Sequence, residues 1–190
     1  LVFPMQLHSW DRNEETPISS VKHVLLAVCC CPTRCPAASQ QKGRGMIAKT
    51  KANKSFRGTT KYVLEKEKAK IIGGNMYGST TDELVEQFTL SAHLNPQLKN
   101  PCYHLMLSAP KTDGALCDEK LAEISERHFA TVVVLSRLEG DEAKVKQPEK
   151  RIADAKLNQL VDRFIAEELP AYDFFIARHE DKEHDHTHIV

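Results

Sequence analysis

The sequence lacks a long apolar run and an excess of charge. None of its 190 residues lies in a stretch near the roughly 20 apolar residues of a membrane-spanning helix, so the sequence predicts no transmembrane span. The formal net charge is zero, so total charge favours neither nucleic acid nor membrane as a partner. Hydrophobic content of 41% and charged content of 27% are ordinary for a soluble globular protein, and the length suits one domain.

Scattered cysteines and a glycine-rich phosphate loop are also missing. Four of the six cysteines fall within Cys29–Cys35, which is unlike the spread of a disulfide framework. Gly73-Gly74 does not have the spacing of a Walker or dinucleotide-binding loop. These absences exclude a disulfide-stapled domain and give no support to a nucleotide-binding one.

Residues 1–45 differ in character from the rest. We expect them to lie outside the native domain, with Met46 as its start. The alternative is a disordered or targeting extension, although the apolar stretch Val24–Val28 is short for a signal peptide. The adjacent thiols of Cys29–Cys35 would chelate a single metal ion poorly. The domain is therefore expected to span residues 46–190.

Hydrophobic periodicity predicts that strands alternate with helices and that the chain closes with a hairpin. Expected strands begin near Met46, Ile71, Cys102 and Thr131, and expected helices lie near 59–64, 79–93, 118–129 and 152–169. In the strand Cys102–Ser108, alternation puts Tyr103, Leu105 and Leu107 toward the core, whereas His104 would either face a site or be exposed. The fold class is α+β, with a central, largely antiparallel sheet flanked by helices.

Four of the nine histidines gather in the last dozen residues: His179, His184, His186 and His188. In a strand His186 and His188 point to the same face, and a preceding strand over 172–178 would bring His179 beside them. Three imidazoles with room for further ligands are typical of an open, catalytic metal site. A purification tag or a solvated turn is the competing interpretation.

A basic stretch surrounds Tyr62. Most of its lysines are expected to form a solvated face, but Lys54, Arg57 and Lys61 could neutralise phosphates and fix the register of a nucleic acid. From composition alone, Tyr62 itself reads as a core residue.

From Met46 onward the chain resembles the nuclease domain of plasmid mobilisation relaxases, in the HUH endonuclease superfamily. Three segments carry the resemblance: Ser55–Leu64, which ends near Tyr62; Tyr103–Pro110, which contains Ser108; and His179–Val190. The last is specific and the second is weak alone. The chain departs from the family pattern in two ways. The link between the helix and the histidine hairpin is longer, and we interpret it as an inserted strand and helix over 131–170. The chain also ends at Val190, where family members continue. We therefore expect a C-terminally truncated domain.

The resemblance implies that Tyr62 attacks single-stranded DNA at a transfer origin and forms a 5′-phosphotyrosyl enzyme. His179, His186 and His188 would hold a divalent metal ion, for which the family expectation is Mg²⁺ or Mn²⁺. Asp181 would orient a ligand histidine or help to accept the Tyr62 proton, with supporting roles for His184 and Ser108.

The resemblance further implies a cytoplasmic enzyme that works with accessory relaxosome proteins and a secretion coupling protein, and not with a membrane. Two alternatives stay open. In a metal-dependent phosphodiester hydrolase, water would be the nucleophile and Tyr62 only a core residue. In a non-catalytic metal- or DNA-binding module, the histidine hairpin would be structural.

Overall fold

The computed structural model describes residues 46–109, 116–138, 152–180 and 184–190. Its elements follow in the order β1 (Ile47–Asn53), α1 (Phe56–Leu64), β2 (Ala69–Gly74), α2 (Thr81–Ala92), β3 (Cys102–Ser108), α3 (Asp118–Arg137), α4 (Asp154–Glu167), the short 3-10 helix η4 (Leu169–Ala171), β4 (Phe175–His179) and β5 (His186–Ile189). The expected extension 1–45 and the candidate residue Asp181 lie outside the described residues.

The five strands form one sheet in the order β1-β3-β5-β4-β2, and every neighbouring pair is antiparallel. The C-terminal hairpin β4–β5 thus occupies the middle of the sheet, between β3 and β2. The expectation of an α+β fold with a central antiparallel sheet is confirmed.

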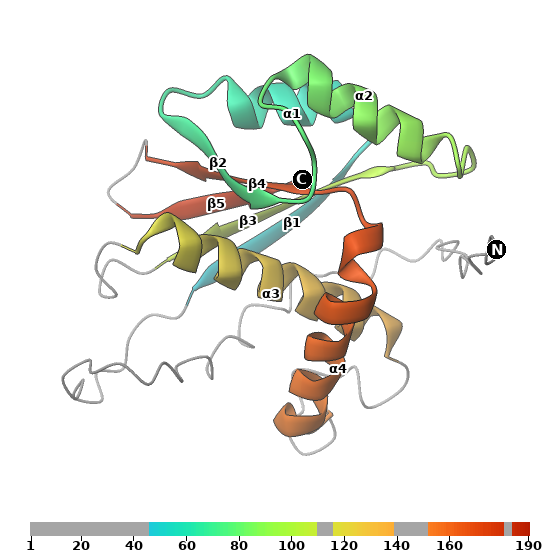
Figure 1. Cartoon of the computed structure of the whole chain (residues 1–190), viewed down its shortest axis with the longest axis vertical. Coiled ribbons are helices and arrows are strands. Elements are labelled where there is room, and N and C mark those ends of the chain that lie inside the picture. The colour runs from blue at the N-terminus through green and yellow to red at the C-terminus, as the bar shows by residue number, and fades with distance from the viewer. Residues whose placement is uncertain (1–45, 110–115, 139–151, 181–183) are drawn as a thin grey trace.

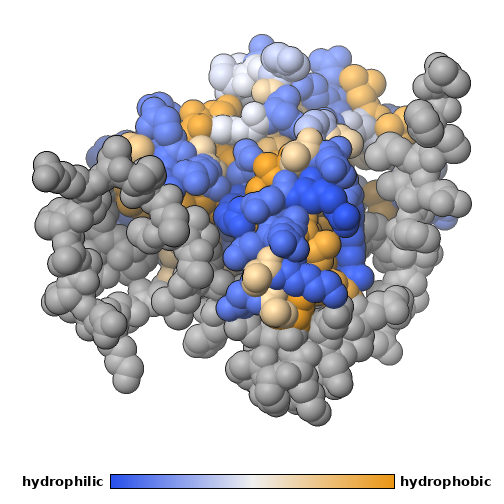
Figure 2. Space-filling model, turned by 60° about the horizontal axis from the view of Figure 1, so that its bottom comes forward, coloured by the Kyte–Doolittle hydropathy of each residue, from blue (hydrophilic) through white to orange (hydrophobic). Residues whose placement is uncertain are grey.

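Helices cover both faces of this sheet. In Figure 1, α1 and α2 lie on one side, and α3 with α4 lies on the other. Alternation along the strands fills both interiors: Leu105, Leu107 and Ile176 pack with α3 and α4, whereas Phe175 and Ala177 pack with α1 and α2. Seen from the α4 end, the surface shows hydrophilic side chains with hydrophobic ones between them (Figure 2).

Local capping explains where two of the helices begin. The Ser55 side chain accepts a hydrogen bond from the Gly58 backbone N–H at 3.1 Å and starts α1. Thr80 and Glu83 form a reciprocal capping box at the start of α2, which satisfies backbone donors that the first turn leaves without partners. Among the described helices none is both long and apolar enough to cross a membrane.

The predicted strand at Thr131–Leu135 is wrong, because these residues form the last turns of α3. Their β-branched side chains favour a strand locally. However, Ala130, Val133 and Val134 are buried at helical spacing against the core, and this packing decides the outcome. The inserted segment is therefore helical where it is described, and the expected second helix is confirmed as α4.

One predicted core residue of β3 is also misplaced. Leu105 and Leu107 are buried as expected, but Tyr103 is 40% exposed. It lies beside Ala52 near the end of the edge strand β1.

Candidate metal centre and its neighbouring tyrosine

The hairpin β4–β5 brings three histidines together. His179 on β4 stands directly opposite His186 on β5, and His188 follows two residues later on the same face. One nitrogen from each ring lies within 4.8 Å of the others. All three residues are buried, with His179 at 0% exposure, so the cluster continues the core between the sheet and α1.

Hydrogen bonds orient these rings. His179 Nε2 donates to the Val63 carbonyl oxygen at 2.7 Å, which leaves Nδ1 as the nitrogen with a lone pair. His188 Nδ1 lies 2.7 Å from Nε2 of His104. His186 Nδ1 faces the His184 carbonyl oxygen at 3.4 Å. Partners of this kind on the far ring nitrogen fix the orientation of metal-binding histidines.

The donor set fits a divalent metal ion. Nε2 of His188 is buried and has no hydrogen-bond partner among the described residues, and a buried polar atom without a partner costs free energy. A bound cation would satisfy this atom. Three imidazoles leave other coordination positions for water or substrate oxygens, as open zinc-type and related sites do.

Burial and neighbouring charges keep His188 and His104 neutral, and the neutral imidazole is the form that binds metal. Burial, followed by the charges of His179 and His104, lowers the pKa of His188 to about 3. Burial, followed by the charge of His179, also lowers the pKa of His104 to about 4. Both imidazoles therefore offer lone pairs at neutral pH.

Tyr62 borders this cluster. It lies in the last turn of α1, and its ring centroid is 6.0 Å from those of His104 and His188, edge to face. The side chain is half exposed, at 50%, so solvent or a substrate can reach it. Because Val63 is the next residue, the Val63–His179 hydrogen bond ties the turn that carries Tyr62 to the hairpin.

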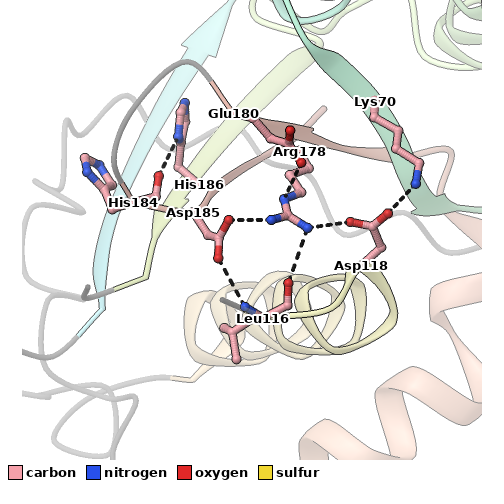
Figure 3. Close-up of polar contacts among 8 residues, drawn as sticks. All are labelled: Lys70, Leu116, Asp118, Arg178, Glu180, His184, Asp185 and His186. Carbon is pink, nitrogen blue, oxygen red and sulfur yellow. Dashed lines mark hydrogen bonds and ion pairs between the residues drawn. The ribbon is translucent and has the colours of Figure 1, made fainter. Parts of the chain in front are cut away.

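The opposite face of the hairpin carries a network of ion pairs (Figure 3). The Arg178 guanidinium lies between Asp118 at 2.7 Å and Asp185 at 2.6 Å, with Glu180 at 3.5 Å. Asp118 also binds Lys70. Asp185 further accepts a hydrogen bond from the Leu116 backbone N–H at 3.2 Å. The network joins the hairpin to the start of α3.

The structure also gives the positions of the other predicted site residues that it describes. Ser108 is opposite His186 in the sheet. The His184 ring is 5.8 Å from that of His186 but is not one of the three clustered histidines. Lys54, Arg57 and Lys61 are exposed.

The sequence did not assign His104, Lys66 or Arg178 to the site, although it left His104 as a possible site-facing residue. His104 has a signal in its alternating strand, but alternation alone does not tell which face meets the site. Lys66 and Arg178 stand close to Tyr62 and His179 in the sequence, yet their partners depend on the folded arrangement.

Comparison with known proteins gives a family. The model of the relaxases described as MobA/VirD2-like, nuclease domain, matches residues 60–134 and 145–190, a region that includes Tyr62 and all the clustered histidines. Searches of curated proteins and of solved structures gave no match. Since the family match spans well over half of the chain, the protein belongs to the MobA/VirD2-like relaxases and carries their nuclease domain.

Proposed function

We propose that this domain nicks single-stranded DNA at a plasmid transfer origin by transesterification, for conjugative mobilisation. The observation that carries the proposal is the position of Tyr62, with its ring 6.0 Å from His188 and its neighbour Val63 bonded to His179. A tyrosine that served only as core would not be half exposed beside three clustered imidazoles.

Tyr62 Oη is the proposed nucleophile. It attacks the phosphorus of one phosphodiester and forms a P–O bond, while the bond from phosphorus to the 3′ oxygen breaks. The tyrosine proton passes to a nearby base or water, and the departing 3′ oxygen gains a proton to become a hydroxyl. The product is a 5′-phosphotyrosyl enzyme, which keeps the bond energy needed to rejoin the strand.

His179, His186 and His188 would hold a divalent cation, for which we infer Mg²⁺ or Mn²⁺. When bound, such an ion supplies polarisation of the phosphate and offsets charge in the transition state. This help matters because a tyrosine hydroxyl has an ordinary pKa near 10. His104 acts through His188 as a positioning residue, since it holds that ring by the far nitrogen.

The remaining assignments belong to the same proposal. Asp181 would position a ligand histidine or accept the Tyr62 proton, while Ser108 and His184 would support the site. Lys54, Arg57 and Lys61 would contact DNA phosphates. Accessory relaxosome proteins, a secretion coupling protein and a cytoplasmic location complete the function inferred from the family.

Trapping the covalent product tests the proposal. The full chain is incubated with Mn²⁺ and single-stranded oligonucleotides that tile the replicon encoding it, and is then run on a denaturing gel. We expect a protein–DNA adduct that disappears in Tyr62→Phe and persists in Tyr77→Phe, because Tyr77 is also exposed but lies outside the cluster.

Other outcomes would contradict the proposal in distinct ways. Nicking without an adduct would identify a metal-dependent hydrolase that uses water. Metal binding without any cleavage would identify a non-catalytic module. An adduct that survives Tyr62→Phe would move the nucleophile elsewhere.

A further inference from the structure

Two lysines of the edge strand β1 point to the same face of the sheet as the histidine cluster. Asn53 Nδ2 donates to Thr59 Oγ1 on α1 at 2.9 Å, so Asn53 faces the α1 side. Ala48 packs against the core under α3 and α4, which is the other side. Because strand side chains alternate, Lys49 and Lys51 share the face of Asn53, and both are exposed.

The strand register places these lysines in line with the site. Lys51 lies opposite His104, and Lys49 lies opposite Met106, which in turn lies opposite His188. Neighbouring strands are about 4.8 Å apart, so two strand spacings, roughly 10 Å, separate the backbone of Lys49 from that of His188. The charge of Lys51, after burial and His179, contributes to the lowered pKa of His104.

A third lysine approaches from the opposite side of Tyr62. Lys66 follows the end of α1, and its Nζ lies 5.4 Å from the Tyr62 ring centroid. After burial and the three neighbouring histidines, its charge also contributes to the lowered pKa of His188. Positive charge therefore stands on both sides of the tyrosine.

The basic residues earlier on α1 have carboxylate neighbours. Arg57 pairs with Asp82 at 2.6 Å and lines a hollow between α1 and α2 with Val85 and Glu86. Lys61 lies 3.7 Å from Glu65 on its own helix. Both are among the residues that we propose contact DNA phosphates, so lysines of β1 and Lys66 would add to the contacts made by α1.

We propose that Lys49, Lys51 and Lys66 form a phosphate-binding track that guides single-stranded DNA over edge strand β1, across the histidines and past Tyr62. This inference rests on the proposed function, whose substrate it refines. The ligand chemistry is a flexible polyanion whose successive phosphates meet lysine ammonium groups, each on a mobile four-carbon stem.

Lysines on an edge strand also discourage pairing with a second sheet. Such a role would leave DNA affinity unchanged when Lys49 and Lys51 are replaced, so a binding measurement separates the two explanations.

The experiment measures the affinity of the full chain for a fluorescent 30-nucleotide single strand of mixed sequence, at several salt concentrations. All proteins carry Tyr62→Phe, so no covalent step contributes. The test variants are Lys49→Gln/Lys51→Gln and Lys66→Gln. The matched control is Lys120→Gln, on α3 at the opposite face of the sheet. Circular dichroism and Mn²⁺ titration check folding and metal binding.

We expect the double variant to lower the slope of log affinity against log salt by about 1.4, because each single-strand phosphate contact contributes about 0.7. At 0.1 M salt this corresponds to a roughly 10- to 30-fold loss of affinity. Lys66→Gln should lower the slope by about half as much, and Lys120→Gln should keep the parent slope.

Unchanged slopes in the track variants, or an equal loss in Lys120→Gln, would overturn the track while leaving the proposed function intact. If the parent protein binds no single strand at all, the proposed substrate itself is wrong, and the track falls with it.

Discussion

The two faces of the hairpin β4–β5 have opposite chemistry although they alternate along the same strands. One face carries His179, His186 and His188, whose rings are buried. The other carries Arg178, fixed by three carboxylates, and Thr187, whose hydroxyl lies 2.7 Å from Ser125 Oγ on α3. Because side chains alternate along a strand, β4 and β5 present the histidine cluster on one face and attach the hairpin to α3 by the other.

The difference separates the free energy of folding, to which the Arg178 face contributes, from the free energy of ion binding, to which the histidine face contributes. The anchoring face satisfies its charges within the protein, so it contributes to folding whether or not an ion is bound. On the histidine face, Nε2 of His188 has no partner among the described residues, so a bound ion would stabilise this face further. Substitutions on the two faces should therefore separate metal affinity from folding.

The largest expected effect is on the histidine face. His188→Gln should weaken Mn²⁺ binding by at least about 100-fold, since it removes a proposed ligand and the contact with His104. Isothermal titration calorimetry measures the change. His93→Gln, at an exposed histidine on the C-cap of α2, is the matched control and should bind like the parent. Equal affinities in all three proteins would remove His188 from the ligand set.

The next effect is on the anchoring face. Arg178→Met leaves Asp118 and Asp185 facing each other at a site where the arginine side chain is only 15% exposed. We expect the free energy of unfolding to fall by about 2–3 kcal/mol in urea titration, with a smaller loss of Mn²⁺ affinity than in His188→Gln. Lys120→Met, which breaks an exposed pair with Glu123, should cost less than about 0.5 kcal/mol. The comparison fails if Arg178→Met affects metal binding more than folding.

A third effect, which separates the two faces by pH, concerns the metal-free protein. The pKa of His104 is lowered to about 4 and that of His188 to about 3, so below the ordinary value of 6.5 the unfolded chain takes up protons that the folded protein refuses. Stability should therefore fall as the pH drops from 6.5 toward 4, by up to about 1.4 kcal/mol per pH unit for each histidine.

Asp118 acts in a lower window. Its pKa is lowered by hydrogen bonds from Lys70 and Arg178, so its contribution is present above the ordinary value of 3.8 and is lost only as the pH falls through its folded pKa. Urea titrations from pH 7 to 4 on the parent and on His104→Asn measure the histidine window. A parent stability that stays flat over that range would contradict the assignment of neutral buried rings.

Much of this arrangement follows from local sequence rules. Period-two alternation in His179–Ile189 predicts which histidines share a face, and the structure brings the same three together. Their role as ligands stays a prediction. Local rules fail at Thr131–Leu135, where β-branched residues continue a helix because Val133 and Val134 meet the core there.

Other features depend on contacts between distant segments. The Arg178 network requires the start of α3 to lie against the hairpin, and the sequence around Arg178 does not predict that contact. His104 gains its meaning only from the pairing of β3 with β5. The positions that local patterns left undecided are thus those whose partners lie 60 or more residues away, as with Asp118 and Arg178.

The hydrogen bond between His179 and the Val63 carbonyl has one more consequence. A carbonyl in the last turn of a helix has no partner within the helix, and here a histidine of the cluster fills that vacancy. Because Tyr62 directly precedes Val63 in the chain, this hydrogen bond couples the position of the tyrosine to that of the His179 ring.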